Sequence, residues 1–350
     1  MTATRYFLGS NTPAGFRDTV SGLYDPADGW RVYFLKGGPG TGKSTLLRRI
    51  AAQTDEAEVY LCSADPDSLD GVRLPQQRLL VVDATAPHAA EPQYWGSCER
   101  LVPLSSCVDN GRLYAERDRL RELSDRCRTH HIRVRRQLSC AAVALNERDG
   151  LLRGAIDTAA IAAYAERLAD KEFEPQTADE NEERRVLCAF TPQGLVPLFE
   201  TAQACCPRLF AVIDEGGVAP MLLSRLRRAA LAAGLNTVIS YSVLFPDRIE
   251  QLLLPQIGTA FLTSHPQTPI DFPVYRRIHT TRFVDTETLR EHRNKRTLLR
   301  RTADACLAEA AAEMQTAKTV HDELEQVYAA ATDWSAVEQM GDTLLQELFG

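Results

Sequence analysis

The sequence lacks long apolar runs: none of its windows holds 18 uninterrupted apolar residues, so we expect no membrane-spanning helix. Its first ten residues lack a basic segment followed by a long apolar one, so we expect no signal peptide. The nine cysteines include no Cys-x-x-Cys pair, and the adjacent Cys205 and Cys206 suit neither a zinc site nor an ordinary disulfide. These absences predict a cytoplasmic protein with reduced cysteines.

An excess of positive charge is also missing. The net charge is −7, which implies no general attraction to nucleic acid or anionic lipid. Two arginine-rich stretches, 126–136 and 290–301, are interpreted as solvated helices, because no aromatic residues that could stack on bases accompany them. We therefore expect neither a membrane nor a nucleic acid as partner. The 350 residues, 44% of them hydrophobic, are enough for two domains with sizeable cores.

The second half of the chain repeats features of the first half in the same order. The segment 5–16 is echoed by 185–195, each with a Thr-Pro-x-Gly turn. The Pro-Asp pair at 66 and the Leu-Pro-Gln run at 74 return at 246 and 254. Several matches in one order and at a nearly constant shift predict two homologous domains, at 1–173 and 184–350. The acidic, proline-containing stretch 173–183 between them has the composition of a linker.

Each half shows apolar strands alternating with helices, a pattern typical of parallel α/β units. A long stretch of good helix formers then closes each half. The sequence therefore predicts an α/β protein: two tandem P-loop-type three-layer domains with parallel sheets, each with a helical appendage. The expected strands are 32–35, 58–62 and 79–83, then 210–213, 237–241 and 260–263. The expected helices are 45–52, 113–146 and 158–170, then 221–233, 286–331 and 336–348.

A phosphate-binding motif follows the strand at 32–35. Gly-x-x-x-x-Gly-Lys-Ser occupies Gly37 to Ser44, directly before a predicted helix, and this context is what the motif requires. Its glycines let backbone N–H groups converge on phosphate oxygens, and the helix N-terminus adds further donors. Lys43 is expected to reach the β- and γ-phosphates. The predicted nucleotide-binding residues are Gly37, Gly38, Pro39, Gly40, Thr41, Gly42, Lys43, Ser44 and Thr45.

A magnesium ion is expected with the nucleotide, held by the hydroxyl of Ser44 and by an acid on a neighbouring strand. Asp83 ends the apolar strand 79–83 and fits that place. Asp65, the first acid after the strand 58–62, is a candidate for positioning the attacking water, although Asp-Pro-Asp-Ser is equally typical of a turn. His88 follows the third strand and could reach the same edge, but a lone histidine is more often structural.

The second half keeps the strand and the helix but not the motif. No lysine or serine stands at the places of Lys43 and Ser44, and Asp214 and Glu215 would bring negative charge toward a phosphate. Aligning the repeats puts Ile213 and Asp214 on residues 35 and 36, with a loop two residues shorter. We interpret this as a degenerate P-loop. The competing hypothesis makes the run ending at Asp214 and Glu215 the magnesium-and-base segment of one large ATPase core.

The sequence resembles a bacterial family of tandem P-loop proteins described as uncharacterised ATPases. The resemblance covers essentially the whole chain and rests on segments 12–16, 36–45, 62–71 and 83–88, and on the late motif from His321 to Tyr328. In that family the second half often looks like a P-loop too, and the acids at 214 and 215 depart from this. The resemblance implies ATP binding and hydrolysis, without a substrate, pathway or partner. His321 and Glu325, four residues apart, are interpreted as a surface or packing pair, because no third metal ligand is evident.

The sequence favours a magnesium-dependent ATPase whose γ-phosphate state controls inter-domain or partner contacts. ATP is preferred over GTP because no Asn-Lys-x-Asp guanine-reading motif is present. Lys43, Asp65 and Asp83 are the predicted catalytic residues. A small-molecule kinase is the alternative, with an acceptor held near residues 65–70. A regulatory module that binds nucleotide with little turnover is the third hypothesis. The protein partner or small-molecule acceptor is left open.

Overall fold

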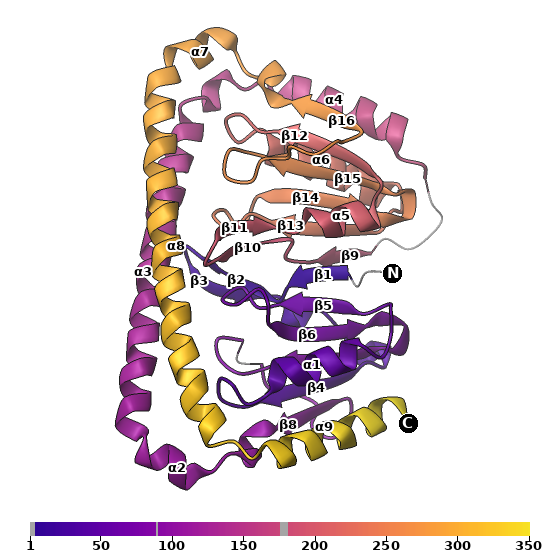
Figure 1. Ribbon diagram of the computed structural model, residues 1–350. Helices are drawn as coiled ribbons and strands as arrows, with labels where there is room; N and C mark the ends of the chain where they lie inside the picture. Colours follow the sequence, from indigo (N-terminus) through magenta and orange to yellow (C-terminus); the bar gives the residue numbers. More distant parts are fainter. Residues whose placement is uncertain (1–3, 89, 176–180) are drawn as a thin grey trace.

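The computed structural model describes residues 4–88, 90–175 and 181–350, so part of the predicted linker 173–183 lies outside the described residues. Two α/β cores lie one above the other, and two long helices run along one side of both (Figure 1). We call residues 4–103 the first core and 182–279 the second core. Residues 110–172 form the first tail and 286–349 the second tail. Within the described residues, no helix combines the length and the apolar character that a membrane crossing demands.

Over the described residues, the two cores contain the same order of elements, except that the second has an additional helix at Phe199–Cys205. The first core comprises β1 (Thr4–Phe7), β2 (Gly9–Thr12), β3 (Gly15–Asp18), β4 (Arg31–Lys36), α1 (Lys43–Ala51), β5 (Glu58–Leu61), β6 (Leu69–Leu74), β7 (Leu79–Asp83) and β8 (Glu99–Pro103). The second comprises β9 (Glu182–Arg184), β10 (Cys188–Thr191), β11 (Gly194–Pro197), α5 (Phe199–Cys205), β12 (Arg208–Ile213), α6 (Ala219–Ala232), β13 (Thr237–Tyr241), β14 (Ile249–Leu254), β15 (Thr259–Ser264) and β16 (Arg276–His279).

Each core is built on a six-stranded mixed sheet. The first sheet has the order β1-β5-β6-β7-β4-β8, and the second has the matching order β9-β13-β14-β15-β12-β16. β6 is antiparallel to β5 and β7, and β14 is antiparallel to β13 and β15, whereas the other neighbours are parallel. The prediction of parallel sheets was therefore wrong for these two strands. The predicted α/β class and the two similar halves are confirmed.

Alternate residues of β4 face two different hydrophobic clusters, as expected of a strand covered on both faces. Val32 and Phe34 belong to a cluster that includes residues of both cores, such as Leu187 and Leu209. Tyr33 and Leu35 belong to a cluster with α1 and the C-terminal helix. The cores also meet at a bridge between Phe7 and Val186, whose N–H and carbonyl oxygen lie 2.9 Å apart.

The tails begin with short helices and continue into long ones. The first contains α2 (Asn110–Ala115), α3 (Arg117–Gly150) and α4 (Thr158–Glu172), and the second contains α7 (Thr286–Glu291), α8 (Arg293–Ala330) and α9 (Trp334–Phe349). Valine, leucine, alanine and methionine side chains from α3 and α8 form a shared cluster, in which Val134 and Leu138 meet Ala310 and Met314. Figure 1 shows the two helices running side by side past both cores.

Each tail packs on the core of the other half. Leu344 and Leu348 of α9 are buried against α1 of the first core, in a cluster with Leu47. Ile161 and Leu168 of α4 belong to the cluster of α6 and the second sheet. In Figure 1, α9 accordingly lies beside the first core and α4 beside the second. The cores and tails of the two halves therefore interlock.

An approximate twofold relationship connects the two tails. The N–H of Asp109 donates to the carbonyl of Ala331 (2.8 Å), and the N–H of Asp285 donates to that of Ala155 (2.9 Å). Adding 176 to 109 and to 155 gives 285 and 331, so one bond is the counterpart of the other. The same shift in numbering therefore relates the other positions of the first tail to those of the second.

Candidate functional site

A glycine-rich loop, residues 37–42, connects β4 to α1; we call it the first glycine loop. Gly40 and Gly42 have φ values of 66° and 89°, in the left-handed region that favours glycine. The helix begins at Lys43 directly after Gly42, and Leu46 and Leu47 on its inner face are buried. This arrangement confirms the predicted strand, loop and helix. It gathers the candidate binding residues 37–45 at the carboxyl end of β4.

Lys43 is folded back onto the loop. Its Nζ donates to the carbonyl oxygens of Gly37 and Gly38, each at 2.8 Å. The same ammonium lies 3.6 Å from Oδ2 of Asp83, and the two side chains are only 12% and 13% exposed. The structure therefore brings together two of the three residues predicted to be catalytic.

Asp83 lies opposite Leu35 at the end of β7, which pairs with β4 in parallel. Its Oδ1 accepts a hydrogen bond from the N–H of Thr85 (2.8 Å). Burial raises the pKa of the Asp83 carboxyl, and the positive charge of Lys43 opposes that rise. The hydroxyl of Thr85 lies within hydrogen-bond distance of both the N–H and the carbonyl of Gly37, at 3.3 and 3.1 Å. The sequence analysis did not give Thr85 a role. Its position two residues after Asp83, the acid that ends β7, is the feature that could have indicated this contact.

Ser44 and Asp65 have partners of different kinds. The Oγ of Ser44, in the first turn of α1, accepts a hydrogen bond from the N–H of Leu69 (2.9 Å). Asp65 lies in the loop after β5, where its carboxylate accepts from the hydroxyl of Ser68 (2.7 Å) and lies 3.8 Å from the ammonium of Lys318. Asp65 thus takes part in the turn that was the alternative interpretation, and it also faces α8.

His88 lies between two carboxylates at the same edge of the sheet. Its Nε2 is 3.1 Å from Asp70, its Nδ1 is 3.7 Å from Asp18, and its ring contacts Phe16 edge-on. Burial lowers the pKa of the imidazole, but interactions with the two carboxylates outweigh it and raise the pKa to about 9. A histidine with that pKa is protonated near neutral pH, so it acts as a buried cation here and not as a general base.

Helix α8 of the second tail covers the first glycine loop. A Cβ added at Gly40 would lie 2.7 Å from the carbonyl oxygen of Glu325, and one added at Gly38 would overlap the ring of Tyr328. The hydrogen bond from His321 lowers the pKa of Glu325, and the charges of His321, Lys318 and Lys43 lower it further. The sequence pointed to His321, Glu325 and Tyr328 only through a family motif, and it did not suggest a contact with the glycine loop.

The second core has a loop at the corresponding place, residues 214–218, which we call the second glycine loop. Leu35 pairs with Asp83, and Val212 pairs with Thr263, which follows the second Leu-Pro-Gln run at the same spacing as Asp83 follows the first. Leu35 therefore corresponds to Val212, whereas the sequence alignment had matched it with Ile213. It follows that Asp214 corresponds to Gly37. The loop is one residue shorter than the first, not two. The competing single-core hypothesis is not supported, because Asp214 and Lys43 follow strands of different sheets.

The carboxylate of Asp214 turns back into its own loop. It accepts hydrogen bonds from the N–H groups of Gly217 (3.2 Å) and Ala219 (2.7 Å), and burial raises its pKa. Ala219 begins α6, as Lys43 begins α1. The second glycine loop therefore directs backbone donors at an anion that the chain itself supplies.

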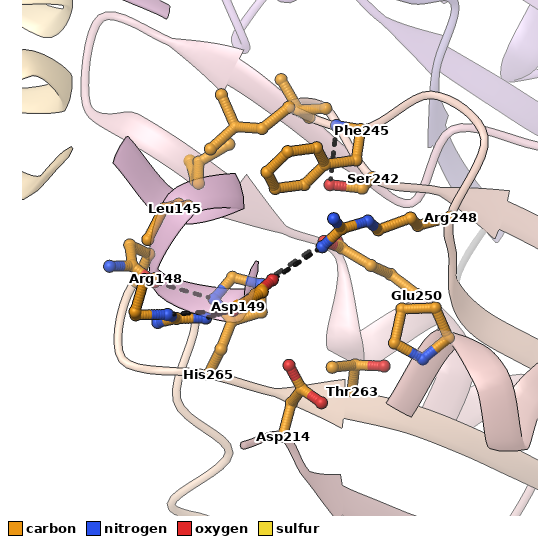
Figure 2. Close-up of a pocket in the computed structure, with 15 residues that line it drawn as sticks. Leu145, Arg148, Asp149, Asp214, Ser242, Phe245, Arg248, Glu250, Thr263 and His265 are labelled. Carbon is orange, nitrogen blue, oxygen red and sulfur yellow. Dashed lines mark hydrogen bonds and ion pairs between the residues drawn. The ribbon is translucent and has the colours of Figure 1, made fainter. Parts of the chain in front are cut away.

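Beside Asp214 lies a pocket of about 50 Å³ that is lined by both charged and apolar side chains (Figure 2). Asp149, from α3, is paired with Arg148 (2.7 Å) and with Arg248 (2.8 Å). Glu250 lies 3.5 Å from the imidazole of His265. Apart from Asp214, whose carboxylate bonds to backbone N–H groups, these charged side chains of the pocket pair with one another. The volume suits a few water molecules and is far below that of a nucleotide.

Among the described residues, no group of three or more histidine, cysteine, aspartate or glutamate side chains is arranged to hold a metal ion. Comparisons with protein-family models, with curated proteins and with solved structures gave no match for this chain. The resemblance to tandem ATPases therefore stays a prediction.

Proposed function

We propose that the first glycine loop is a P-loop and that the first core binds and hydrolyses a nucleoside triphosphate, with ATP as the preferred substrate. The observation that carries the proposal is the 3.6 Å approach of Lys43 and Asp83 at the ends of two adjacent parallel strands. Ligands of parallel α/β sheets bind at this edge, and a lysine and an acid side by side are the charges that a magnesium–triphosphate complex requires.

Lys43 can exchange its present hydrogen-bond acceptors for phosphate oxygens. Its two bonds to carbonyl oxygens of Gly37 and Gly38 are to neutral acceptors, whereas phosphate oxygens carry negative charge and form stronger bonds with an ammonium. The glycine N–H groups and the N-terminus of α1 add donors around the same point. The loop therefore favours a polyphosphate over its present internal contacts.

The residues present also fit a magnesium ion that enters with the nucleotide. Magnesium keeps several waters and takes few protein ligands besides the phosphates, so a hydroxyl and one carboxylate suffice. Ser44 is oriented by the N–H of Leu69, and Asp83 by the N–H of Thr85. Bound there, the ion would neutralise phosphate charge. Burial raises the pKa of Asp83, and a bound cation would counter that rise because it favours the ionised form.

In hydrolysis, a water oxygen bonds to the γ-phosphorus while the bond to the β–γ bridging oxygen breaks, giving nucleoside diphosphate and inorganic phosphate. Lys43 neutralises charge that develops on the terminal and bridging oxygens. Asp65 is the predicted water-positioning acid. It contacts Ser68 and Lys318 in the loop after β5, and we expect a bound γ-phosphate to draw Lys318 away and free its carboxylate.

The contact of α8 with the first glycine loop supports a nucleotide-controlled rearrangement. Glu325 and Tyr328 lie against Gly40 and Gly38, so any change in the loop on phosphate binding reaches the second tail directly. Because α8 packs along α3 and leads into α9, such a change would alter how the halves interlock. A protein partner that binds one of the two arrangements is compatible with the proposal. The assay below separates the ATPase from the kinase and regulatory-module hypotheses.

The test is phosphate release by the full chain with ATP and with GTP, without an added acceptor and with or without magnesium. Lys43→Ala should abolish release, and Lys171→Ala is the matched control because Lys171 is exposed on α4. Release that requires magnesium and Lys43 would support an NTPase and argue against a kinase. Nucleotide binding without release would favour the kinase or the regulatory module, and no binding would overturn the proposal.

A further inference from the structure

One face of α8 points at the first glycine loop and at the loop after β5. Residues 318, 321, 325 and 328 are spaced by three and four positions, so they share a side of the helix. Glu325 and Tyr328 touch the glycine loop, and His321 lies 3.6 Å from Glu325. Lys318, two turns earlier, extends toward the loop after β5. The second tail thus supplies a polar wall to a site in the first core.

In the part of the chain that the structure describes, the side-chain partners of Lys318 are carboxylates. Its ammonium is 2.9 and 3.1 Å from the two oxygens of Asp322 and 3.8 Å from Oδ1 of Asp65. The side chain is 27% exposed, so the ammonium is partly sheltered but can move. Asp65 follows β5 at the carboxyl edge of the sheet, the side on which Lys43 and Asp83 also lie. A cation from the second half therefore lies at the same edge of the sheet as the proposed nucleotide site.

The second glycine loop offers a comparison within the same molecule. The shift in numbering between the tails relates Lys318, His321, Glu325 and Tyr328 to Ala142, Leu145, Asp149 and Leu152. Asp149 lies against Gly217, and Leu152 lies against Gly216, as Glu325 and Tyr328 lie against the first loop. In Figure 2, Leu145 and Asp149 accordingly line the pocket of the second core. The two tails therefore hold corresponding positions over the two loops.

The faces of α8 and α3 that cover the two loops differ in their basic residues. Over the second loop, the position of Lys318 is an alanine and that of His321 is a leucine. The acid is retained, as Asp149. The lysine is present in the tail that covers the first glycine loop, which is followed by Lys43. It is absent from the tail that covers the second glycine loop, where Asp214 accepts the backbone hydrogen bonds. The partner changes with it, because Asp65 beside Lys318 is replaced in the second half by Phe245, which packs against the same apolar cluster as Ala142.

We infer that Lys318 is a phosphate-binding residue supplied by the second tail, and that it contacts the γ-phosphate of the nucleotide in the first core. The inference rests on the proposed function. The amides of a P-loop enclose the β-phosphate, so the terminal phosphate faces the edge where Lys318 lies. On nucleotide binding the ammonium exchanges Asp65 and Asp322 for phosphate oxygens. Lys318 thereby links the interlocked second tail to the presence of the terminal phosphate.

The experiment compares ATP and ADP binding, and phosphate release, in the wild-type full chain and in Lys318→Ala. Loss of a charge-assisted hydrogen bond should weaken ATP binding about tenfold or more. ADP binding should change by less than about twofold, because ADP lacks the group that Lys318 contacts. Phosphate release should fall on the order of 100-fold, the usual cost of losing one donor to transition-state charge. Lys318→Arg should recover part of the loss, since it keeps the charge.

Lys295→Ala is the matched control, because Lys295 is an exposed α8 lysine paired with Glu147 at 3.5 Å. It should bind both nucleotides as the wild type does. Equal weakening of ATP and ADP binding by Lys318→Ala, or no weakening of either, would overturn the inference and leave the proposed function intact. The same comparison in Lys318→Gln applies if the alanine variant does not fold. A wild-type protein that binds neither nucleotide would overturn both.

Discussion

The carboxylate of Asp214 accepts a hydrogen bond of 2.7 Å from the backbone N–H of Ala219, the residue that corresponds to Lys43 in the other core. The loop for which we propose phosphate binding is thus matched in the second core by one whose N–H groups bond to its own side chain. In the second core, a carboxylate of the chain itself occupies the donors at the start of the helix. In the same core, the charges around Asp149 and Glu250 are already paired.

This relationship predicts a structural role for Asp214. Asp214→Ala removes the acceptor for two N–H groups at the start of α6, and loss of such a cap costs about 1–2 kcal/mol of unfolding free energy. Urea unfolding would measure it, with Asp271→Ala as the control because Asp271 is exposed. Nucleotide binding by the first core should be unchanged. Equal stabilities of the two variants would contradict the role given to Asp214.

A second prediction concerns the buried cation His88. A pKa raised from 6.5 to about 9 means that the folded protein binds the proton more tightly than the unfolded chain. The resulting stabilisation is complete below pH 6.5 and is lost as the pH rises through about 9. The difference between these values corresponds to about 3 kcal/mol.

The comparison of wild type with His88→Gln by urea unfolding at pH 6 and pH 9.5 measures this effect. Wild type should be the more stable at pH 6, and most of that advantage should disappear at pH 9.5. Glutamine keeps a hydrogen-bond donor near Asp70 but cannot carry the charge. An advantage that stays constant with pH would show that His88 acts through packing alone.

The interlocked tails predict that the end of the chain stabilises its beginning. Leu344 of α9 is 5% exposed and packs in the cluster of α1, next to the first glycine loop. Leu344→Ala should lower the free energy of unfolding by about 2–4 kcal/mol and weaken nucleotide binding under the proposed function. Leu298→Ala on α8, where the leucine is 63% exposed, should do neither. Nucleotide binding that survives full detachment of α9 would argue against this coupling.

The sequence predicted the elements whose pattern is local. The apolar strand before Gly37, the helix after Gly42 and the strand ending at Asp83 are confirmed because each depends on a short run of residues. β6 was missed because it begins at Leu69 and Asp70, within a segment rich in aspartate, proline and glycine that resembles a turn. Its partner strands on both sides are what make it a strand.

The exchange of the tails could not be predicted in this way. A stripe such as Ile161 and Leu168 shows that a helix buries one face, but it does not identify the surface that covers that face. The two tails have similar patterns, so either core would have satisfied either tail. The contact of Lys318 with Asp65 joins residues that are far apart in the chain, so no local sequence pattern predicts it. The interpretation of the second glycine loop as a degenerate P-loop came from the acids at 214 and 215 in the sequence, and it stays a prediction.

The last prediction concerns Cys127, which lies on α3 at its contact with α8. Burial alone would raise the pKa of its thiol, but interactions with His131 and His321 outweigh it and lower the pKa to about 6. Alkylation by iodoacetamide, mapped by mass spectrometry, should therefore speed up through pH 6 and level off above pH 7. In His321→Ala the rise should move to higher pH, because one stabilising partner of the thiolate is lost. Exposed Cys140 gives the reference rate in each sample. A Cys127 alkylation rate that still climbs steeply between pH 7 and pH 8 in the wild type would contradict a thiolate at neutral pH. It would also contradict the polar contacts that run from α3 through His321 to Glu325, which lies against the first glycine loop.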